Sequence, residues 1–387
     1  MSPAKRKSSA KELTGRILGT MYKNRRYTAV DLFAGAGGLT LSAHACKADV
    51  VFAVENDPHA AATYRLNFCN SEVLNAPTLY DQSIIDLDAK RLASEHFGSE
   101  TECDILLGGP PCQGFSTHRI KDAGVDDPRN HLIYRYFDFI SALRPRAFLM
   151  ENVPGILWPR HKGFLDEFYR LAKSLGYSVR EPTIVDARDF GVPQRRKRVF
   201  IVGYRDTEVQ FGHWPPLATH GPSGNLDDLP EWNGCAEVFR PAPLGDPNDI
   251  HMRHGQELIE VFRNTPANGG SRRDSGRVLA CHESHNGHKD VYGRIDPNAP
   301  APTMTTACIN PSKGRFVHPT RHHGITVRQA ARIQDFPDHF KFSGGLMAAG
   351  KQIGNAVPKR LGAVLINAIL VELNDAAIAK QKLEASA

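Results

Sequence analysis

A single cysteine, Cys112, follows two prolines in the segment "GGPPCQGFS", residues 108–116. Each proline removes a backbone donor and fixes φ, so the segment is predicted to be a stiff loop rather than a helix or a central strand. The apolar run "CDILLGG" before it predicts a strand that ends at this loop. A thiol held rigidly at the end of a buried strand is suited to nucleophilic attack. The alternative from this motif alone is a structural turn with an incidental cysteine.

Two further stretches add an acid and several cations. Glu151 opens "ENV", at the end of another apolar run, and "QRRKR" spans residues 194–198. Strand alternation predicts that Gln194, Arg196 and Arg198 point to one side of this run, and Arg195 and Lys197 to the other. The plainer interpretations are a salt bridge for Glu151 and a solvated face for the basic run. A thiol, an acid and guanidinium groups converging on one crevice favour nucleophilic attack on a polar heterocycle.

A glycine-rich turn, "DLFAGAGGLT", stands between the first predicted strand and the first predicted helix. Glycines in this place allow a ligand to approach the backbone closely. Glu55 ends the second predicted strand, 20 residues after Gly35, where an acid can accept both hydroxyls of an adenosine ribose. A nicotinamide dinucleotide site is the alternative, but its G-x-G-x-x-G pattern requires glycine where Thr40 stands. The turn therefore predicts an adenosine-containing cofactor.

Strands and helices must alternate to position these residues. Short apolar runs and amphipathic stretches follow one another over residues 27–205, which is typical of an α/β fold with a doubly wound, mostly parallel sheet. Predicted strands occupy residues 27–34, 49–56, 103–109, 146–153, 178–186 and 198–204. Predicted helices occupy residues 37–48, 58–68, 132–143 and 164–176.

This pattern breaks over residues 206–323, which are rich in Pro, Gly, His and Asn. The stretch is too long for a structureless loop, so it is predicted to be an inserted small domain. Residues 206–250 carry one basic and eight acidic side chains, and residues 251–325 carry ten basic and six acidic ones. The second part is therefore the one expected to face a polyanion. Residues 324–387 are again helical and are expected to return to the first domain.

Composition sets limits on the class of protein. The 387 residues are 41% hydrophobic and 23% charged, with seven cysteines and no C-x-x-C pair, which predicts a reduced, cytosolic globular chain. We expect no signal peptide, and "LGAVLINAILVEL" is predicted to be a buried helix rather than a membrane span. Residues 1–26 hold eight basic side chains and one acidic one, so the net charge of +6 belongs to this segment. It is either a disordered solubilising tail or an arm that touches nucleic-acid phosphates.

The motifs taken together resemble those of the C5-cytosine DNA methyltransferases. "DLFAGAGG", "GGPPCQGFS", "ENV", "QRRKR", "TVRQAARIQDFP" and "KQIGNAVP" occur in the order of that family, over about residues 27–205 and 324–360. The resemblance implies a Rossmann-like class I methyltransferase, with the insertion 206–323 as its target-recognition domain. It also implies S-adenosyl-L-methionine as cofactor and S-adenosyl-L-homocysteine as product.

The resemblance implies roles for particular residues. Cys112 would add to C6 of a flipped-out cytosine, Glu151 would hydrogen-bond N3, Arg198 would bind O2, and Arg196 would help to fix the thiol loop and the base. Glu55 would bind the cofactor ribose, and Ser83 or Asp86 would meet its adenine amino group. The implied cofactor site comprises Asp31, Phe33, Gly35, Gly37, Gly38, Leu39, Glu55, Asn56, Asp86, Pro111, Asn355 and Ala356. The implied DNA contacts are Gln113, Ser116, Gln194, Arg294, Thr303 and Thr305.

Partners follow from the same resemblance. We expect double-stranded DNA as substrate, no membrane, a monomer in the bacterial cytoplasm associated with the nucleoid, and a cognate restriction endonuclease as a possible companion. A zinc site in "CHESHNGH" is conceivable but disfavoured by its spacing, so no metal is expected. An RNA methyltransferase with the same catalytic set, or a non-catalytic DNA-binding relative, are the competing hypotheses. The recognised DNA sequence does not follow from the chain.

Overall fold

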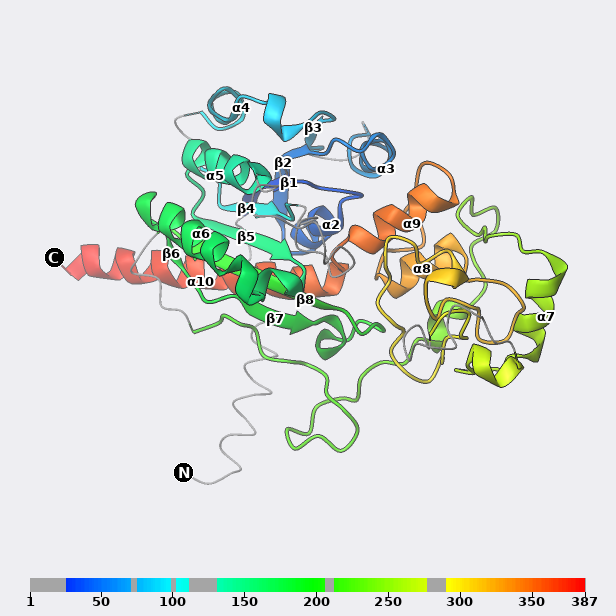
Figure 1. Cartoon of the computed structure of the whole chain (residues 1–387). Helices are drawn as coiled ribbons and strands as arrows, with labels where there is room; N and C mark the ends of the chain where they lie inside the picture. The colour runs from blue at the N-terminus through cyan, green and yellow to red at the C-terminus, as the bar shows by residue number, and fades with distance from the viewer. Residues whose placement is uncertain are drawn as a thin grey trace.

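A central sheet organises the first half of the chain (Figure 1). The computed structural model describes residues 26–70, 75–98, 102–110, 131–205, 212–276 and 290–386. Within these ranges one eight-stranded sheet has the order β3-β2-β1-β4-β5-β8-β6, and β7 also pairs with β8. The strands are β1 (Tyr27–Leu32), β2 (Ala48–Val54), β3 (Thr78–Tyr80), β4 (Ile105–Gly108), β5 (Ala147–Asn152), β6 (Ser178–Val179), β7 (Thr183–Asp186) and β8 (Lys197–Tyr204).

Strand direction confirms the predicted sheet. The pairs among β1 to β5 are parallel, whereas β8 runs antiparallel to β5, β6 and β7. The carboxyl ends of β1, β2, β4 and β5 therefore meet at one edge, which is the edge where ligands bind in folds of this class. The predicted strands and helices were found within a few residues of their places, except that the strand predicted over residues 178–186 is divided into β6 and β7. The short strand β3 and the helix α4 (Ala89–His96) were not predicted.

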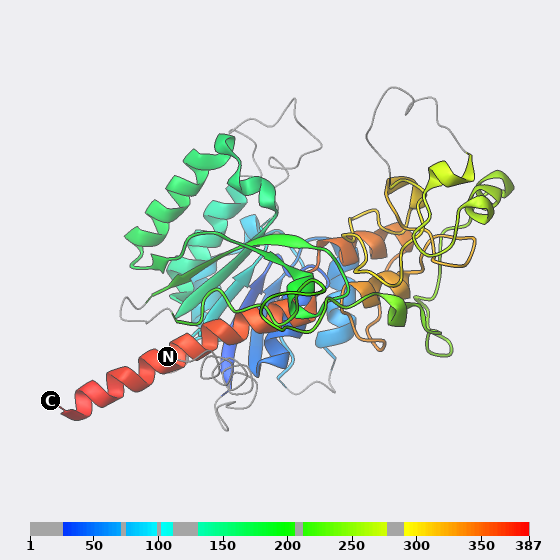
Figure 2. The same cartoon turned by 90° about the horizontal axis from the view of Figure 1, so that it is seen from below.

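Helices cover both faces of the sheet and create two apolar layers. The helices α4, α5 (His131–Leu143) and α6 (Lys162–Ser174) pack on one face, against strand residues such as Phe148 and Met150. The helices α2 (Gly38–Ala45), α3 (Pro58–Phe68) and α10 (Lys359–Ser386) pack on the other, against Ala147 and Leu149. The alternation of these four residues along β5 shows why each parallel strand is almost wholly apolar. Figure 2 shows α10 and α6 on opposite sides of the sheet.

Helix α10 is the most apolar late segment of the chain. Residues 346–382 have the length and composition of one membrane span, but half of the most apolar window is buried against the rest of the protein, as in a core helix. Glu372 lies in the middle of the helix, is fully buried, and accepts hydrogen bonds from the backbone of His213 and Trp214. The prediction of a buried helix agrees with this packing.

A second lobe follows β8 and contains little regular structure. Its helices are α7 (Gln256–Asn264), α8 (Val327–Ile333) and α9 (Leu346–Asn355), and Figure 1 shows all three beside the sheet rather than on it. Helix α8 packs on residues 236–239 of this lobe, whereas α9 packs both on α8 and on α3 of the first domain, where Lys351 pairs with Asp57. One apolar core continues from the sheet into this lobe, including Val238, Phe316 and Ile353.

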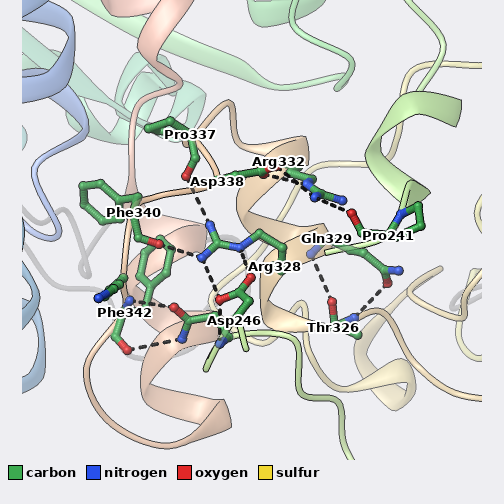
Figure 3. Close-up of polar contacts among 12 residues, drawn as sticks. Pro241, Asp246, Thr326, Arg328, Gln329, Arg332, Pro337, Asp338, Phe340 and Phe342 are labelled. Carbon is green, nitrogen blue, oxygen red and sulfur yellow. Dashed lines mark hydrogen bonds and ion pairs between the residues drawn. The ribbon is translucent and has the colours of Figure 1, made fainter. Parts of the chain in front are cut away.

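Two buried arginines of α8 hold the second lobe together (Figure 3). Arg328 forms a bidentate pair with Asp246, at 2.5 and 3.0 Å, and also donates to the carbonyls of Pro337 and Phe340. The side chains of this pair are 1% and 3% exposed. Arg332 pairs with Asp338 and donates to three carbonyls of residues 238–241. The motif "TVRQAARIQDFP" thus ties residues 238–246 to α8.

Candidate active site

The glycine-rich turn after β1 has a backbone that few sequences can adopt. Phe33, Gly35 and Gly37 all have positive φ, at 59°, 57° and 93°. The turn is closed by a hydrogen bond from Gly37 N to Ala34 O, at 2.9 Å. A phenylalanine with positive φ is strained, and such strain gathers where a ligand is bound. A Cβ atom added at Gly35 would meet no atom within 4 Å, so this part of the turn is open to a ligand.

Gly38 brings the turn against the other end of the chain. A Cβ atom there would lie 2.6 Å from Val357 O, so only glycine permits the approach. Ala356 is buried at this contact and Asn355, the last residue of α9, is exposed. Leu39 is 7% exposed and belongs to the apolar core. The structure therefore brings together the first and last parts of the expected cofactor site.

Glu55 is oriented by two backbone groups. Its Oε2 accepts from Gly35 N and its Oε1 from Asp57 N, both at 2.7 Å. Burial raises the pKa of Glu55 above its ordinary value. Asn56 is exposed beside it. Each carboxylate oxygen still has acceptor capacity, so the geometry fits a diol such as a ribose.

Below the turn lies a buried polar chain that sequence reasoning had not assembled. Thr40 donates to Asp31 Oδ2 at 2.7 Å, and the hydroxyls of Thr40 and Tyr64 are 2.9 Å apart. Asp31 is fully buried, and its Oδ1 has no hydrogen-bond partner among the residues that the structure describes. Burial raises the pKa of Asp31 to about 7, and the nearby Glu55 carboxylate acts in the same direction. The sequence signal for the contact between Thr40 and Asp31 was the threonine itself, which stands where the dinucleotide-binding pattern requires glycine.

The expected adenine contact involves a short helix after β3. In the 3-10 helix Ile84–Asp86, the hydroxyl of Ser83 accepts from Ile85 N at 3.3 Å, which caps the helix. Asp86 is exposed at the other end of the helix. Of the two candidates, Asp86 has the side chain that is not used in capping.

Glu151 and Arg198 form an ion pair at the carboxyl edge of the sheet. Arg198 Nε lies 2.9 Å from Glu151 Oε1, and the two side chains are 14% and 13% exposed. Glu151 comes from β5 and Arg198 from β8, the antiparallel neighbour of β5. Arg198 also donates to the carbonyl of Lys197, at 2.8 Å. The pair is the salt bridge of the plainer interpretation, and it also brings an acid and a guanidinium to one place, as the functional interpretation expects.

The end of β4 lies beside this pair. A Cβ atom at Gly109 would be 3.2 Å from Glu151 Oε2, and Asn152 Nδ2 lies 3.5 Å from Pro110 O. The described chain stops at Pro110, so the expected roles of Pro111, Cys112, Gln113 and Ser116 fall outside the described residues. The same holds for residues 1–25 and for "CHESHNGH". The segment leading to Cys112 is nevertheless in contact with Glu151.

The basic run alternates as predicted. Gln194 and Arg196 are fully buried and Arg198 is half-buried, whereas Arg195 and Lys197 are exposed. Arg196, however, uses its guanidinium inside the protein, where it donates to carbonyl oxygens of residues 304, 354 and 356. Among the described residues Arg196 fixes these backbone segments, whereas its expected part in fixing the thiol loop and the base falls outside them.

Two expected DNA contacts are corrected by their burial. Gln194 is fully buried and bonded to Met304 N and to Gln334 Oε1. Arg294 is 2% exposed, and its guanidinium donates to the carbonyls of Phe262, Thr265, His318 and Arg321. Both side chains therefore hold the protein together, because their hydrogen-bonding groups are taken by neighbouring segments.

The other expected DNA contacts lie nearer the surface. Thr305 is exposed, and Thr303 is half-buried and donates to the carbonyl of Arg195 at 2.6 Å. Both follow the buried bridge between Gln194 and Ala301. In the part of the chain that the structure describes, no three His, Cys, Asp or Glu side chains are grouped so that they could hold a metal ion.

Known proteins are similar to this chain in sequence and in fold. A type II methyltransferase of Haemophilus parahaemolyticus, M1.HphI, is 31% identical over 351 residues, covering 89% of this chain and 86% of the relative. The type II methyltransferase M.Sau96I of Staphylococcus aureus is 32% identical over 365 residues, which cover 91% of this chain and 77% of the relative. A crystal structure of a DNA modification methyltransferase encoded in an E. coli prophage has the same fold, with a TM-score of 0.69, 24% identity, and coverage of 90% of this chain and 99% of that one. The sequence model of the C-5 cytosine-specific DNA methylases matches residues 27–371. The second lobe, the sheet edge with Glu151 and Arg198, and the part of α10 up to residue 371 fall within this match, and the chain belongs to the family of C-5 cytosine-specific DNA methylases.

Proposed function

We propose that this DNA cytosine-5 methyltransferase works through a covalent adduct between Cys112 and C6 of a cytosine flipped out of duplex DNA, with S-adenosyl-L-methionine as methyl donor. The observation that supports this most is the ion pair of Glu151 and Arg198, 2.9 Å apart at the end of β5. The strand end that leads to Cys112 lies against this pair. A thiol, an acid and a guanidinium can therefore act on one ring.

Each residue answers a chemical requirement of the ring. C5 of cytosine is a poor nucleophile, and addition of a thiolate at C6 makes C5 enamine-like. Glu151 shares a proton with N3 and so offsets the charge that gathers on the ring. Arg198 donates to O2 while it holds Glu151, which suits a cation that must stabilise charge in the transition state. After methyl transfer a base, such as a water molecule, removes the C5 proton and the thiol leaves.

The cofactor site is proposed at the glycine-rich turn. The open backbone at Gly35, the oriented carboxylate of Glu55 and the buried unpartnered oxygen of Asp31 fit a nucleoside that carries positive charge. Bound S-adenosyl-L-methionine supplies an electrophilic methyl group and leaves as S-adenosyl-L-homocysteine. Phe33, Gly37, Asn56, Asp86 and Asn355 would complete the site, with Pro111 from the loop of Cys112.

Sequence recognition is proposed for the second lobe. Residues 251–325 carry the basic excess of the chain beyond its N-terminal segment, and Thr303 and Thr305 lead from this lobe to the sheet. Sequence is read by base-edge contacts, while phosphates are bound by cations. We infer a monomer that methylates one duplex sequence in the bacterial cytoplasm, at the nucleoid. A cognate restriction endonuclease fits with the type II relatives.

A substrate analogue tests the covalent step. Fluorine at C5 of the target cytosine cannot leave as a cation, so methyl transfer should end in a protein–DNA adduct at Cys112 that survives denaturant. Cys112→Ser should form none, because a hydroxyl is a far weaker nucleophile than a thiolate. Cys69→Ser, a half-buried thiol elsewhere, should form the adduct normally. A cross-link mapped to any other residue would overturn the mechanism.

RNA is the competing substrate. Mass spectrometry of nucleosides after incubation with S-adenosyl-L-methionine and either duplex DNA or tRNA distinguishes the two. We expect 5-methylcytosine in the DNA alone, and bisulfite sequencing of DNA from a host expressing the chain then gives the recognised sequence.

A further inference from the structure

Four chain segments meet at three buried polar side chains next to the proposed site. These side chains are Gln194, Arg196 and Gln334, and each is fully buried. The segments are residues 193–198 before and in β8, residues 301–305 leaving the second lobe, residues 333–334 at the end of α8, and residues 354–356 at the end of α9. We call the three side chains the amide–guanidinium cluster.

Arg196 supplies the charge of this cluster. Its Nη1 donates to Met304 O at 2.9 Å, and its Nη2 donates to Gly354 O and Ala356 O at 2.8 and 2.9 Å. Burial lowers the pKa of Arg196, and the neighbouring Arg198 acts in the same direction. A buried guanidinium is costly unless its donors are satisfied, so the two terminal nitrogens hold the three carbonyls in place, while Nε has no partner among the described residues. Arg196 thereby joins the DNA-side segment to the cofactor-side segment.

The two glutamines form a directional relay. Gln334 Nε2 donates to Ala356 O, and Gln334 Oε1 accepts from Gln194 Nε2 at 2.7 Å. Gln194 Nε2 also donates to Ile333 O, and Gln194 Oε1 accepts from Met304 N at 2.9 Å. Each amide therefore has one orientation that satisfies its neighbours, and turning one leaves the other unsatisfied. A displacement of residue 356 therefore shifts residue 304 through the side chains of Gln334 and Gln194.

Close packing leaves the segments joined by this relay little room to move. A Cβ atom at Gly354 would lie 2.3 Å from the carbonyl carbon of Thr305, so the cofactor-side and DNA-side segments touch backbone to backbone. Asn355 lies in the first of these segments, is exposed, and is one of the residues of the proposed cofactor site. Arg198 lies on β8, two residues after Arg196, and forms the ion pair with Glu151. The proposed cofactor site and the proposed cytosine site are thus both connected to the amide–guanidinium cluster.

We propose that Gln334 is a positioning residue that couples cofactor binding to cytosine binding. This inference rests on the proposed function, since it assumes that Asn355 faces S-adenosyl-L-methionine and that Arg198 and Glu151 face the base. Binding at residues 355–356 then favours the arrangement of residues 194–198 and 303–305 that accepts DNA, and the reverse follows by linkage. Neither ligand needs to touch Gln334.

The test measures coupling and not activity alone. Calorimetry gives the Kd of S-adenosyl-L-homocysteine with and without a duplex oligonucleotide that carries the site found by bisulfite sequencing. Couplings of this kind are typically about 5- to 150-fold. In Gln334→Met the ratio of the two Kd values should fall toward one, because methionine fills the space but makes neither hydrogen bond. In Gln194→Met/Gln334→Met it should fall no further, because the two amides act through each other.

A matched control separates coupling from stability. Gln329 is also a buried glutamine of α8, and its side chain forms a capping box with Thr326. Gln329→Met should lower the Tm while leaving the ratio as in the parent protein. If Gln334→Met does not fold, Gln334→Glu keeps the acceptor for Gln194 and loses the bond to Ala356 O, so the ratio should still fall.

The outcomes distinguish the two proposals. An unchanged ratio in folded Gln334→Met, or an equal loss in Gln329→Met, would overturn the positioning role while leaving the proposed function intact. A parent protein that binds neither S-adenosyl-L-homocysteine nor the duplex would overturn the proposed function itself.

Discussion

Arg198 and Glu151 face each other across two antiparallel strands, with Nε and Oε1 2.9 Å apart and both side chains mostly withdrawn from solvent. Glu151 stands opposite Phe200 in the register of β5 and β8, so Arg198 reaches it diagonally from two residues away. Diagonal pairs of long side chains remain within reach across such strands. The pair leaves Glu151 Oε2 beside Gly109 and therefore beside the segment that leads to Cys112.

Glu151→Gln should retain the fold and lower the methylation rate. The amide keeps the shape of the carboxyl group but cannot exchange a proton with N3, and acid–base contributions of this kind are about 10²- to 10⁴-fold. Arg198→Lys should also be slow, because an ammonium lacks the planar fork of a guanidinium. Single-turnover kinetics with tritiated S-adenosyl-L-methionine measure both effects. Normal turnover in Glu151→Gln would remove the residue from the mechanism.

Glu55→Gln should weaken cofactor binding while leaving DNA binding in place. One carboxylate oxygen is replaced by a donor, and hydrogen bonds to charged groups contribute about 1.5–3 kcal/mol each. The affinity for S-adenosyl-L-methionine should therefore fall roughly 10- to 100-fold in calorimetry. Glu95→Gln, an exposed helix position paired with Arg91, is the control and should bind normally. Equal affinities in the two variants would contradict the ribose assignment.

Asp31 should make the free energy of unfolding depend on pH near neutrality. The pKa of Asp31 is raised to about 7 in the folded chain, so the unfolded chain ionises first. The stability that Asp31 contributes is thus fully present below about pH 4 and is lost as the pH rises through 7. Urea unfolding at several pH values should show this slope in the parent protein and a reduced slope in Asp31→Asn. Identical slopes would show that Asp31 does not titrate in this window.

Asp246→Asn should destabilise the second lobe. The substitution leaves Arg328 buried at 1% exposure without its carboxylate, and breaking a buried pair costs about 3–5 kcal/mol. Asp166→Asn removes a pair whose side chains are 77% and 62% exposed, and it should change the free energy of unfolding little. Denaturant unfolding compares the two.

Removing residues 1–24 should flatten the salt dependence of DNA binding. The segment 1–26 holds eight basic residues and one acidic one, and none of the proposed site residues. Phosphate contacts release counterions, so their loss lowers the slope of log affinity against log salt. Turnover at low salt should stay nearly intact. An unchanged slope would assign the segment to a solubilising role.

The sequence was most informative where a residue type is required by local backbone or by burial. Alternating apolar runs predicted the sheet, and the glycine pattern predicted the turn at Gly35. The convergence of Glu151 and Arg198 on one edge of the sheet followed from both lying at strand ends, whereas their direct ion pair was not predicted. The burial of Arg294 and Gln194 could not be predicted, because a polar side chain is buried only where distant segments, such as residues 318–321, supply hydrogen-bond partners. For the same reason the placement of α8 with the second lobe depended on Asp246, which no local pattern marks.

The contact of α2 with α10 has a consequence for synthesis of the chain. A Cβ atom at Gly362 would lie 2.3 Å from Ser42 Oγ, so the two helices lie in close contact. Ribosomes add about 5–20 residues per second, so the apolar face of α2 waits on the order of 15–60 s for its partner. During that time Leu39 and Ala43 lack the cover that they have in the finished protein. Newly made chains should therefore recruit chaperones, and a ribosome that stops before residue 356 releases a sheet whose cofactor turn has no partner at Gly38.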